Sequence, residues 1–331
     1  MRWALIGAST IADGPMVGAI RAQGGTVGWI VSGSQARAQD FAARHGGQAT
    51  TEMDRALADP TVGAVYISST NEKHFPQAMA AIAAGKAVLC EKPLAMTVDQ
   101  AAIMVRAAAD KGVTFATNHH LRCAGSHRAI KALIDAGRIG RILSVRVHHA
   151  VFLPPVLQGW RISAPEAGGG VIADITVHDA DTVRFHLGED PVAVVAQATV
   201  SGLGQGVEDS CMSVWSMPSG AQVFAHESFT HAHAGTGIEF HGTEGSILAR
   251  NVMTQRPVGE IELVTSRGRE AIGFAAADLY TTGLGAFLEA VAGRGRPAAD
   301  GVDGLKSLAV AAAVRQAATT GLRTQVAYAG F

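Results

Sequence analysis

The sequence predicts two domains: an α/β domain with a doubly wound parallel sheet, then an α+β domain with a large, mainly antiparallel sheet. Up to about residue 120, short apolar strand patterns alternate with helical patterns, which is typical of parallel strands joined by crossover helices. After about residue 140, runs that alternate with period two recur, which is typical of an antiparallel sheet with one covered face. The length of 331 residues suits two domains better than one. We therefore predict a first domain over residues 1–120 and a second over 121–331.

In the first domain, each predicted strand is short and apolar and ends at small or polar residues. The predicted strands are residues 3–6, 27–31, 64–68, 87–90 and 113–117. Helical patterns follow the first strand to about residue 23, follow the second to about residue 41, and begin again in the Ala-rich stretch after residue 74. This order predicts right-handed crossovers and one parallel sheet.

The second domain carries the strand patterns of a single sheet. They cover residues 143–148, 192–196, 211–215, 222–226, 238–242 and 261–264. Two Ala-rich helices, residues 281–292 and 301–319, could cover a face of either sheet, so they could pack back on the first domain. The other face of this sheet could support a homo-oligomer or face water, and the sequence leaves both open.

Composition excludes several classes of protein. Apolar residues make up 48% and charged residues 17%, which favours a packed core over disorder. Lys and Arg number 27 against 28 Asp and Glu, and aromatics are 5%, so we expect neither nucleic-acid nor membrane partners. No apolar run approaches a membrane span. Three scattered cysteines indicate free thiols, no metal site and a cytoplasmic location.

The end of the first strand predicts a dinucleotide site. A glycine turn that leads into a helix presents free N–H groups and the helix dipole to a pyrophosphate. The usual fingerprint is G-x-G-x-x-G/A, and serine replaces the second glycine here. The predicted phosphate-binding segment is Gly7, Ala8, Ser9, Thr10, Ile11 and Ala12.

The end of the second strand predicts the form of the dinucleotide. Enzymes that bind NAD usually place Asp or Glu there to bond the ribose 2′-hydroxyl. This chain has Ser32, Gly33, Ser34 and, three residues later, Arg37. No carboxylate would repel a 2′-phosphate, and a guanidinium suits phosphate oxygens. We therefore expect NADP(H) rather than NAD(H), although Arg37 could instead be a solvated helix residue.

Further motifs follow in a specific order along nearly the whole chain. They are Thr70-Asn71-x-x-His74, Glu91-Lys92-Pro93-Leu94-Ala95, Asn118-His119-x-x-Arg122, Gly168-Gly169-Gly170-x-x-x-Asp174-x-x-x-His178 and Gly242-Thr243-x-Gly245-Ser246. Together with the segment from Gly7 to Ala12, they make the chain resemble the glucose-fructose oxidoreductase/inositol 2-dehydrogenase (Gfo/Idh/MocA) family. Ser9 departs from the glycine of many relatives, which puts the cofactor preference in question rather than cofactor binding.

The resemblance implies a set of site residues. Lys92, Asp174 and His178 would converge on the substrate as catalytic residues. The further cofactor-binding residues that it implies are Ser69, Thr70, Asn71, His74, Glu91, Lys92, Asn118, Trp160, Arg161 and Tyr280. Trp160 could instead be interdomain packing.

The residue types suit carbonyl reduction, which needs a hydride donor, a proton donor and a group that stabilises the oxyanion. Lys92 follows a strand end, where doubly wound folds place their ligands. Asp174 and His178 would share one face of a helix, and imidazole titrates nearest neutrality. Alternatives are a surface i,i+4 pair or an altered zinc pair. The triple glycine before them could approach a ligand or form a flexible loop. His119, His120 and His149 could line the substrate pocket or be structural.

The leading hypothesis is an NADPH-dependent reductase of a keto sugar. One alternative is an NAD-dependent dehydrogenase of an inositol or pyranose hydroxyl. A second is a non-catalytic NADP(H)-binding regulator, which the joint presence of Lys92, Asp174 and His178 disfavours.

Overall fold

The computed structural model describes residues 1–331, and these form two compact units. Residues 1–119 and 280–305 make up the first unit. Residues 120–279 and 306–331 make up the second. The chain therefore returns to the first unit after completing most of the second, and the long helix near its end belongs to both.

The first unit contains a six-stranded, all-parallel sheet in the order β3-β2-β1-β4-β5-β6. Its strands are β1 (Arg2–Ile6), β2 (Thr26–Val31), β3 (Gln48–Thr50), β4 (Ala64–Ile67), β5 (Ala87–Cys90) and β6 (Phe115–Thr117). The order reverses between β1 and β4, which is the point where doubly wound folds bind ligands at the carboxyl ends of the strands. The predicted α/β fold class is confirmed, and β3 is a strand that the sequence pattern missed.

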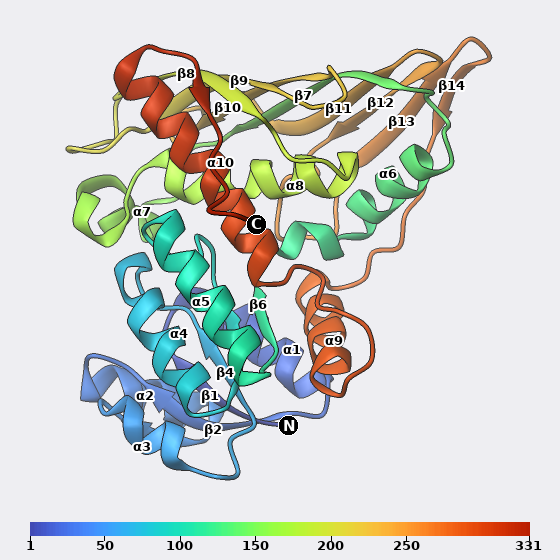
Figure 1. The fold of residues 1–331 in the computed structure, drawn as a ribbon. Coiled ribbons are helices and arrows are strands. Elements are labelled where there is room, and N and C mark those ends of the chain that lie inside the picture. Colours follow the sequence, from blue (N-terminus) through green and yellow to red (C-terminus); the bar gives the residue numbers. More distant parts are fainter. The chain divides into compact units, whose positions relative to one another are not determined.

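Helices connect the strands and cover this sheet (Figure 1). They are α1 (Val17–Ala22), α2 (Gln35–His45), α3 (Met53–Ala58), α4 (His74–Ala83), α5 (Val98–Lys111) and α9 (Leu279–Val291). Figure 1 shows α9 beside α1, and Gln23 at the end of α1 donates a 3.0 Å hydrogen bond to the Thr281 carbonyl oxygen. The Trp3 ring of β1 lies 5.6 Å from that of Phe287 on α9. Thus α9 completes the core of the first unit.

The second unit is built on a nine-stranded sheet in the order β14-β13-β12-β11-β7-β10-β9-β8-β15. The strands are β7 (Ile142–Ala150), β8 (Ala193–Thr199), β9 (Ser210–Ser216), β10 (Gln222–Ser228), β11 (Thr236–Gly242), β12 (Gly245–Arg250), β13 (Glu260–Thr265), β14 (Gly268–Ala271) and β15 (Thr324–Gln325). All neighbours are antiparallel except β7 and β10. The prediction of a large, mainly antiparallel sheet is confirmed.

One face of this sheet is covered by helices. Its helices are α6 (Gly125–Asp135), α7 (Pro155–Ser163), α8 (Val177–Leu187) and the later part of α10 (Gly301–Thr320). Figure 1 shows α6 and α8 along the same face. Val145, Val147 and Trp215 of the sheet are buried with Val177 of α8 and Val314 of α10 in one apolar core. At 20 residues α10 is the longest helix, and none combines the length and apolar character that a bilayer-spanning helix needs.

The opposite face of the sheet carries exposed apolar side chains. Val195, Val214 and Phe224 are Cα neighbours across β8, β9 and β10. Their exposed fractions are 44%, 37% and 44%. This row lies on the face of the sheet that could support a homo-oligomer or face water. A homo-oligomer through this face stays a prediction.

Two helices depart from the regular α-helix that the patterns predict. Residues 12–16 and 172–176 are π-helical and run directly into α1 and α8. In the first segment, Pro15 lies inside the turn and has no N–H to donate to the preceding turn. π-helical turns inside helices are frequent at functional sites. Each segment contains a predicted site residue, Ala12 in the first and Asp174 in the second.

Candidate functional site

The turn after β1 is shaped by close contact with the next strand of the sheet. Gly7 has φ +106°, and a Cβ there would lie 2.7 Å from the backbone C of Ser68 and the N of Ser69. Its N–H also donates to the Val31 carbonyl oxygen of β2 at 2.8 Å. Only glycine fits both the left-handed φ and the contact. The predicted role of Gly7 as the turn residue therefore has a steric basis.

Ser9 caps the helix that follows this turn. Its Oγ accepts a 3.1 Å hydrogen bond from the N–H of Ala12, and its hydroxyl donates to Ser68 Oγ at 2.8 Å. A serine in this position satisfies one of the orphan N–H groups of a helix start. The N–H groups of Thr10 and Ile11 belong to the same first turn. The segment is an N-terminal helix turn of the kind that binds anions.

The end of β2 presents hydroxyls and a cation without a carboxylate. Ser32 is 8% exposed, and its Oγ accepts a 3.4 Å hydrogen bond from the N–H of Ser34. Ser34 is the N-cap of α2, and its Oγ accepts from the Arg37 N–H at 3.4 Å. A Cβ on Gly33 would meet no atom within 4 Å, so the turn is open at that point. Arg37 is exposed in the first turn of α2.

A buried hydrogen-bond network joins the ends of the three later strands. Tyr66 of β4 donates a 2.5 Å hydrogen bond to Glu91 Oε1, and Asn118 Nδ2 donates to the same oxygen at 2.6 Å. Burial raises the pKa of Glu91, while the two donors and the neighbouring Lys92 oppose that rise. The two donors thus fix the carboxyl group directly before Lys92. Tyr66 was not predicted, because it lies within an apolar strand pattern.

His74 connects the loops after β4 and β5. Its Nδ1 lies 2.8 Å from the Pro93 carbonyl oxygen and its Nε2 lies 3.1 Å from that of Ser69. The side chain is fully buried, and burial lowers its pKa. His74 therefore holds the loop that carries Lys92 against the loop after β4. The peptide bond between Lys92 and Pro93 is cis. The family resemblance implies a cofactor-binding role for His74.

The remaining predicted residues of the first unit lie in the same loops or on α9. Ser69 donates a 2.6 Å hydrogen bond to Gln77 Oε1. Thr70 donates a 2.7 Å hydrogen bond to Glu72 Oε1. Asn71 is 4% exposed, and Tyr280 at the start of α9 is 3% exposed. The loops after parallel strands share one edge of the sheet, so Ser69, Thr70 and Asn71 after β4 lie at its carboxyl edge.

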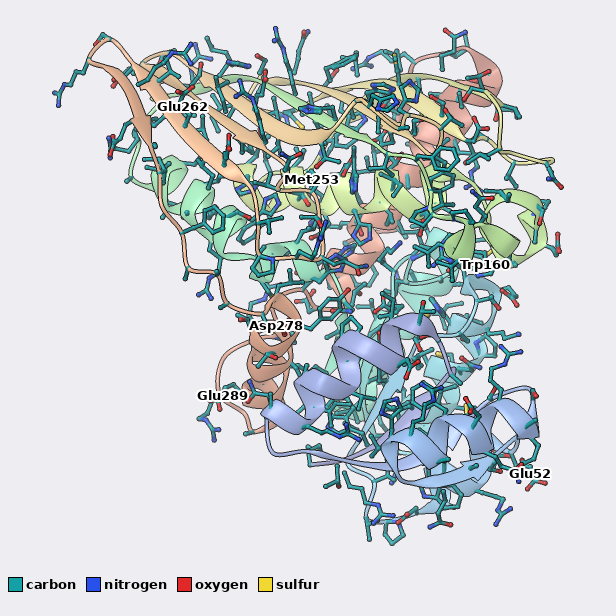
Figure 2. The ribbon with its side chains drawn as sticks, turned by 180° about the vertical axis from the view of Figure 1, so that it is seen from behind. Glu52, Trp160, Met253, Glu262, Asp278 and Glu289 are labelled. Atoms are coloured by element: carbon teal, nitrogen blue, oxygen red, sulfur yellow. The ribbon has the colours of Figure 1, made fainter.

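In the second unit, Asp174 forms an ion pair with Arg161, another predicted site residue. Arg161 Nε lies 3.4 Å from Asp174 Oδ2, and the Arg161 guanidinium lies 4.7 Å from the ring centroid of Trp160. Trp160 and Arg161 come from α7, and Figure 2 labels Trp160. The three predicted residues Trp160, Arg161 and Asp174 are therefore linked in one chain of contacts.

His178 follows Asp174 on the same helix. Because residues 172–176 are π-helical, the two do not have the spacing of a regular α-helix that the sequence predicts. The His178 ring lies 4.9 Å from that of His120, edge to face. Arg122, two residues after His120, donates two 2.7 Å hydrogen bonds to Asp181 of α8. This buried ion pair ties α8 to the segment that carries His120.

The triple glycine before Asp174 is tightly packed. Gly170 has φ +107°, and a Cβ there would lie 2.4 Å from Glu208 Oε1. The same oxygen accepts a 3.2 Å hydrogen bond from the Ile172 N–H. The structure therefore favours close packing over the alternative of a flexible loop.

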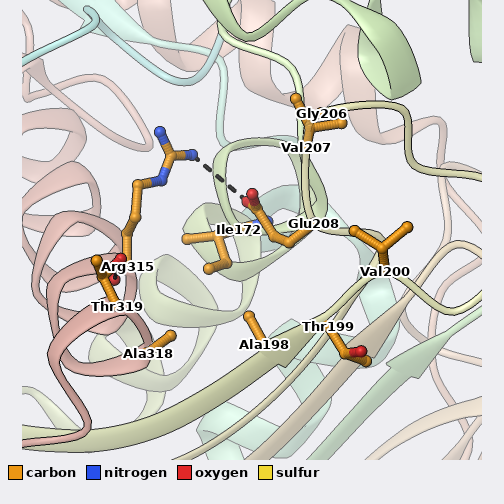
Figure 3. A pocket seen from close by; sticks show the side chains of 10 residues that line it. All are labelled: Ile172, Ala198, Thr199, Val200, Gly206, Val207, Glu208, Arg315, Ala318 and Thr319. Carbon is orange, nitrogen blue, oxygen red and sulfur yellow. Dashed lines mark hydrogen bonds and ion pairs between the residues drawn. The ribbon is translucent and has the colours of Figure 1, made fainter.

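A pocket of about 380 Å³ lies beside this packed segment (Figure 3). Figure 3 shows Arg315 of α10 pointing toward Glu208, and the two charged groups are 3.6 Å apart. Its lining residues are Ile172, Ala198, Thr199, Val200, Gly206, Val207, Glu208, Arg315, Ala318 and Thr319. None of the predicted catalytic or cofactor-binding residues lines it.

Family models match both parts of the chain. Residues 1–119 match the model described as an oxidoreductase family with an NAD-binding Rossmann fold. Residues 127–248 match the GFO/IDH/MocA C-terminal domain.

Similar proteins act on sugars or related polyols. The chain is 52% identical over 327 residues to 1,5-anhydro-D-fructose reductase of Ensifer adhaerens, covering 98% of each chain. It is 30% identical over 296 residues to inositol 2-dehydrogenase of Rhizobium meliloti, covering 86% of each. Among solved structures, a 3-ketoreductase from Actinomadura kijaniata in complex with NADP and TDP-benzene is 25% identical with a TM-score of 0.85. That match covers 96% of this chain and 97% of the other.

The contact at Gly7 generates a stability and binding prediction. Gly7→Ala adds a Cβ against backbone atoms at a left-handed φ, so we expect a loss of roughly 3 kcal/mol in the free energy of unfolding. Nicotinamide dinucleotide binding should weaken at least tenfold. Urea denaturation and fluorescence titration measure the two effects. Gly18→Ala, in α1 with no atom within 4 Å of the new Cβ, is the control and should stabilise by up to about 1 kcal/mol. Equal effects of the two substitutions would contradict the steric argument.

Proposed function

The chain belongs to the GFO/IDH/MocA family of oxidoreductases, and we propose that it is an NADPH-dependent reductase of a keto sugar. It is a sugar oxidoreductase by its family and relatives. The proposed substrate is 1,5-anhydro-D-fructose, and the proposed product is 1,5-anhydro-D-mannitol.

The substrate proposal rests on sequence similarity to one relative over nearly the whole chain. Identity of 52% to a 1,5-anhydro-D-fructose reductase extends over 98% of both chains. Four local stretches also resemble such reductases. They are residues 90–96, 117–122, 157–161 and 251–255. Three of these contain residues with defined contacts in the structure, since Asn118 donates to Glu91 of the first stretch and Arg161 pairs with Asp174.

The proposed chemistry divides carbonyl reduction among a few side chains. The nicotinamide supplies the hydride when it is bound. Lys92 holds the substrate carbonyl oxygen, where its ammonium stabilises negative charge that develops on that oxygen. His178 donates the proton that completes the new hydroxyl. Asp174 and its partner Arg161 keep this end of the helix in position.

The NADPH proposal rests on the end of β2. The exposed Arg37 and the hydroxyls of Ser32 and Ser34 offer one cation and two polar groups near a turn that is open at Gly33. Ser34 also caps α2, so its hydroxyl can donate to a phosphate while its oxygen accepts from Arg37 N–H. A similar fold, the 3-ketoreductase, was solved with NADP.

A second candidate function is oxidation of an inositol or pyranose hydroxyl with NAD. The 30% identity to an inositol 2-dehydrogenase over 86% of the chain favours it. The absence of an acid after β2 weighs against it. A non-catalytic NADP(H)-binding regulator is a third candidate, and a purified protein that binds NADPH without turnover would favour it.

The proposed function is tested by absorbance at the nicotinamide band. Purified protein is given NADPH or NADH with 1,5-anhydro-D-fructose, a panel of ketoses, or inositols with NAD. We expect rapid oxidation of NADPH with 1,5-anhydro-D-fructose and at least tenfold slower reaction with the other ketoses. Activity confined to NAD and an inositol would replace the reductase proposal with the dehydrogenase.

Lys92→Ala tests the role of the lysine. Loss of the ammonium should lower kcat by roughly 10²- to 10⁴-fold, the range of acid–base and oxyanion contributions. The Kd of NADPH should change by less than threefold, because the proposed contact is to the substrate. Steady-state kinetics and fluorescence titration measure both quantities. Lys111→Ala, an exposed lysine at the end of α5, is the control. Turnover near that of the wild type would remove Lys92 from the mechanism.

Arg37→Ala tests the cofactor preference. Removal of the guanidinium should raise the KM for NADPH about tenfold, equivalent to about 1.4 kcal/mol, and leave the KM for NADH unchanged. Kinetics with each cofactor, at saturating keto sugar, give the two values. The control is Arg55→Ala on α3, an exposed arginine of the same unit. A parallel change for both cofactors would assign Arg37 to the solvated surface.

A further inference from the structure

Three titratable side chains lie inside the apolar layer between the nine-stranded sheet and α8. Asp179 of α8 and Glu227 of β10 are fully buried, and His149 of β7 is 9% exposed. Glu227 and His149 are Cα partners across the parallel pairing of β10 and β7. They point to the face that also carries Val147 and Ala225, both in the core. The mechanism proposed above uses none of the three.

Their hydrogen bonds are unequal. Asp179 Oδ1 lies 2.9 Å from His149 Nδ1, so the imidazole donates to the carboxylate there. Asp179 Oδ2 and both oxygens of Glu227 are buried with no hydrogen-bond partner in the protein. A buried polar atom without a partner is costly, and two such carboxyl groups require an explanation.

The surroundings of the two carboxyl groups contain little positive charge. The imidazoles of His148 and His149 on β7 lower the pKa of Asp179. Glu227 faces Asp179 and the Thr176 hydroxyl, and Cys211 of β9 is its Cα partner on the other side. No lysine or arginine forms an ion pair with either carboxyl group. Two like charges without a cation in a dry interior cannot both persist.

The energetic balance distinguishes the two acids. Burial raises the pKa of Glu227 well above its usual range, the neighbouring Asp179 raises it further, and the Thr176 hydroxyl and the Glu227 backbone oppose that rise. Burial also raises the pKa of Asp179, but the charge and hydrogen bond of His149 oppose that rise. These causes favour ionisation of Asp179 over ionisation of Glu227.

We propose that Glu227 stays a neutral carboxylic acid at neutral pH. It leaves Asp179 as the single buried negative charge that orients His149. With Nδ1–H directed at Asp179, the imidazole presents Nε2 for a hydrogen bond to a ligand hydroxyl. Only this last step rests on the proposed sugar-reductase function, and the charge state of Glu227 is independent of it.

Infrared difference spectroscopy on the full-length protein in D₂O tests the charge state directly. We expect the wild type to show the C=O stretching band of a protonated carboxylic acid between pD 6 and 8. Glu227→Gln should lose that band while retaining the fold, because the amide is a neutral isostere of the acid. Glu262→Gln, on the exposed pair with Arg269, is the control and should retain the band. Since no step of this measurement involves turnover, its failure is distinguishable from failure of the proposed function.

Several outcomes would overturn the proposal. One is a wild type without the acid band, which is decisive even if Glu227→Gln does not fold. Another is a band that survives in Glu227→Gln and disappears in Asp179→Asn. A kcat/KM of folded Glu227→Gln reduced more than tenfold would also overturn it, because a neutral acid is replaced there by a neutral amide. We expect that ratio to stay within threefold of the wild type, and Asp179→Asn to lower it at least tenfold.

The pH dependence of stability gives an independent reading. A glutamate whose pKa is raised on folding contributes stability that is fully present below its ordinary pKa of about 4.3. That stability is lost as the pH rises through the pKa of the folded state. The midpoint of thermal unfolding of the wild type should therefore fall between pH 5 and 9 more steeply than that of Glu227→Gln. Equal slopes for the two proteins would show that Glu227 is ionised in the folded state.

Discussion

The close approach of β1 and β4 at Gly7 is the constraint on which the first unit depends. The backbone of Ser68 and Ser69 occupies the space that a side chain on Gly7 would need. The chain can therefore turn sharply into a helix at the point where the strand order reverses. Ser9 then caps that helix and bonds to Ser68, so one residue joins the turn to the neighbouring strand. The serine that departs from the usual fingerprint has a structural function of its own.

Polar side chains at the carboxyl edge of the first sheet hold one another. Glu91 accepts from Tyr66 and Asn118, and His74 contacts the carbonyl oxygens of Ser69 and Pro93. Several residues that the family motifs mark as cofactor-binding thus have defined contacts within the protein. Their direct effect is on the loop that presents Lys92. A motif residue can therefore act through the shape of a loop as well as through contact with a ligand.

Helix α8 carries buried charged side chains, which is unusual for a helix that covers a sheet. Asp179 and Asp181 are both buried, and each has a specific partner, His149 or Arg122. These partners come from β7 and from the segment before α6, so the helix is tied to two other elements at once. Glu227 lacks such a partner, and the cost of a second buried charge explains why its proton is retained. The charges around His178 are thus set by packing between elements.

The sequence by itself determined the fold class, most strands and the Gly7 turn, because these depend on local periodicity and on the backbone freedom of a single residue. Motif order was enough to indicate the family and the catalytic candidates Lys92, Asp174 and His178. Only the tertiary structure decided that residues 280–305 join the first unit and that residues 172–176 are π-helical. It alone brought Tyr66 to Glu91 and Asp179 to His149, across 25 and 30 residues of chain. Such pairings depend on how strands and helices pack, and the pattern of residues adjacent in sequence does not determine that packing.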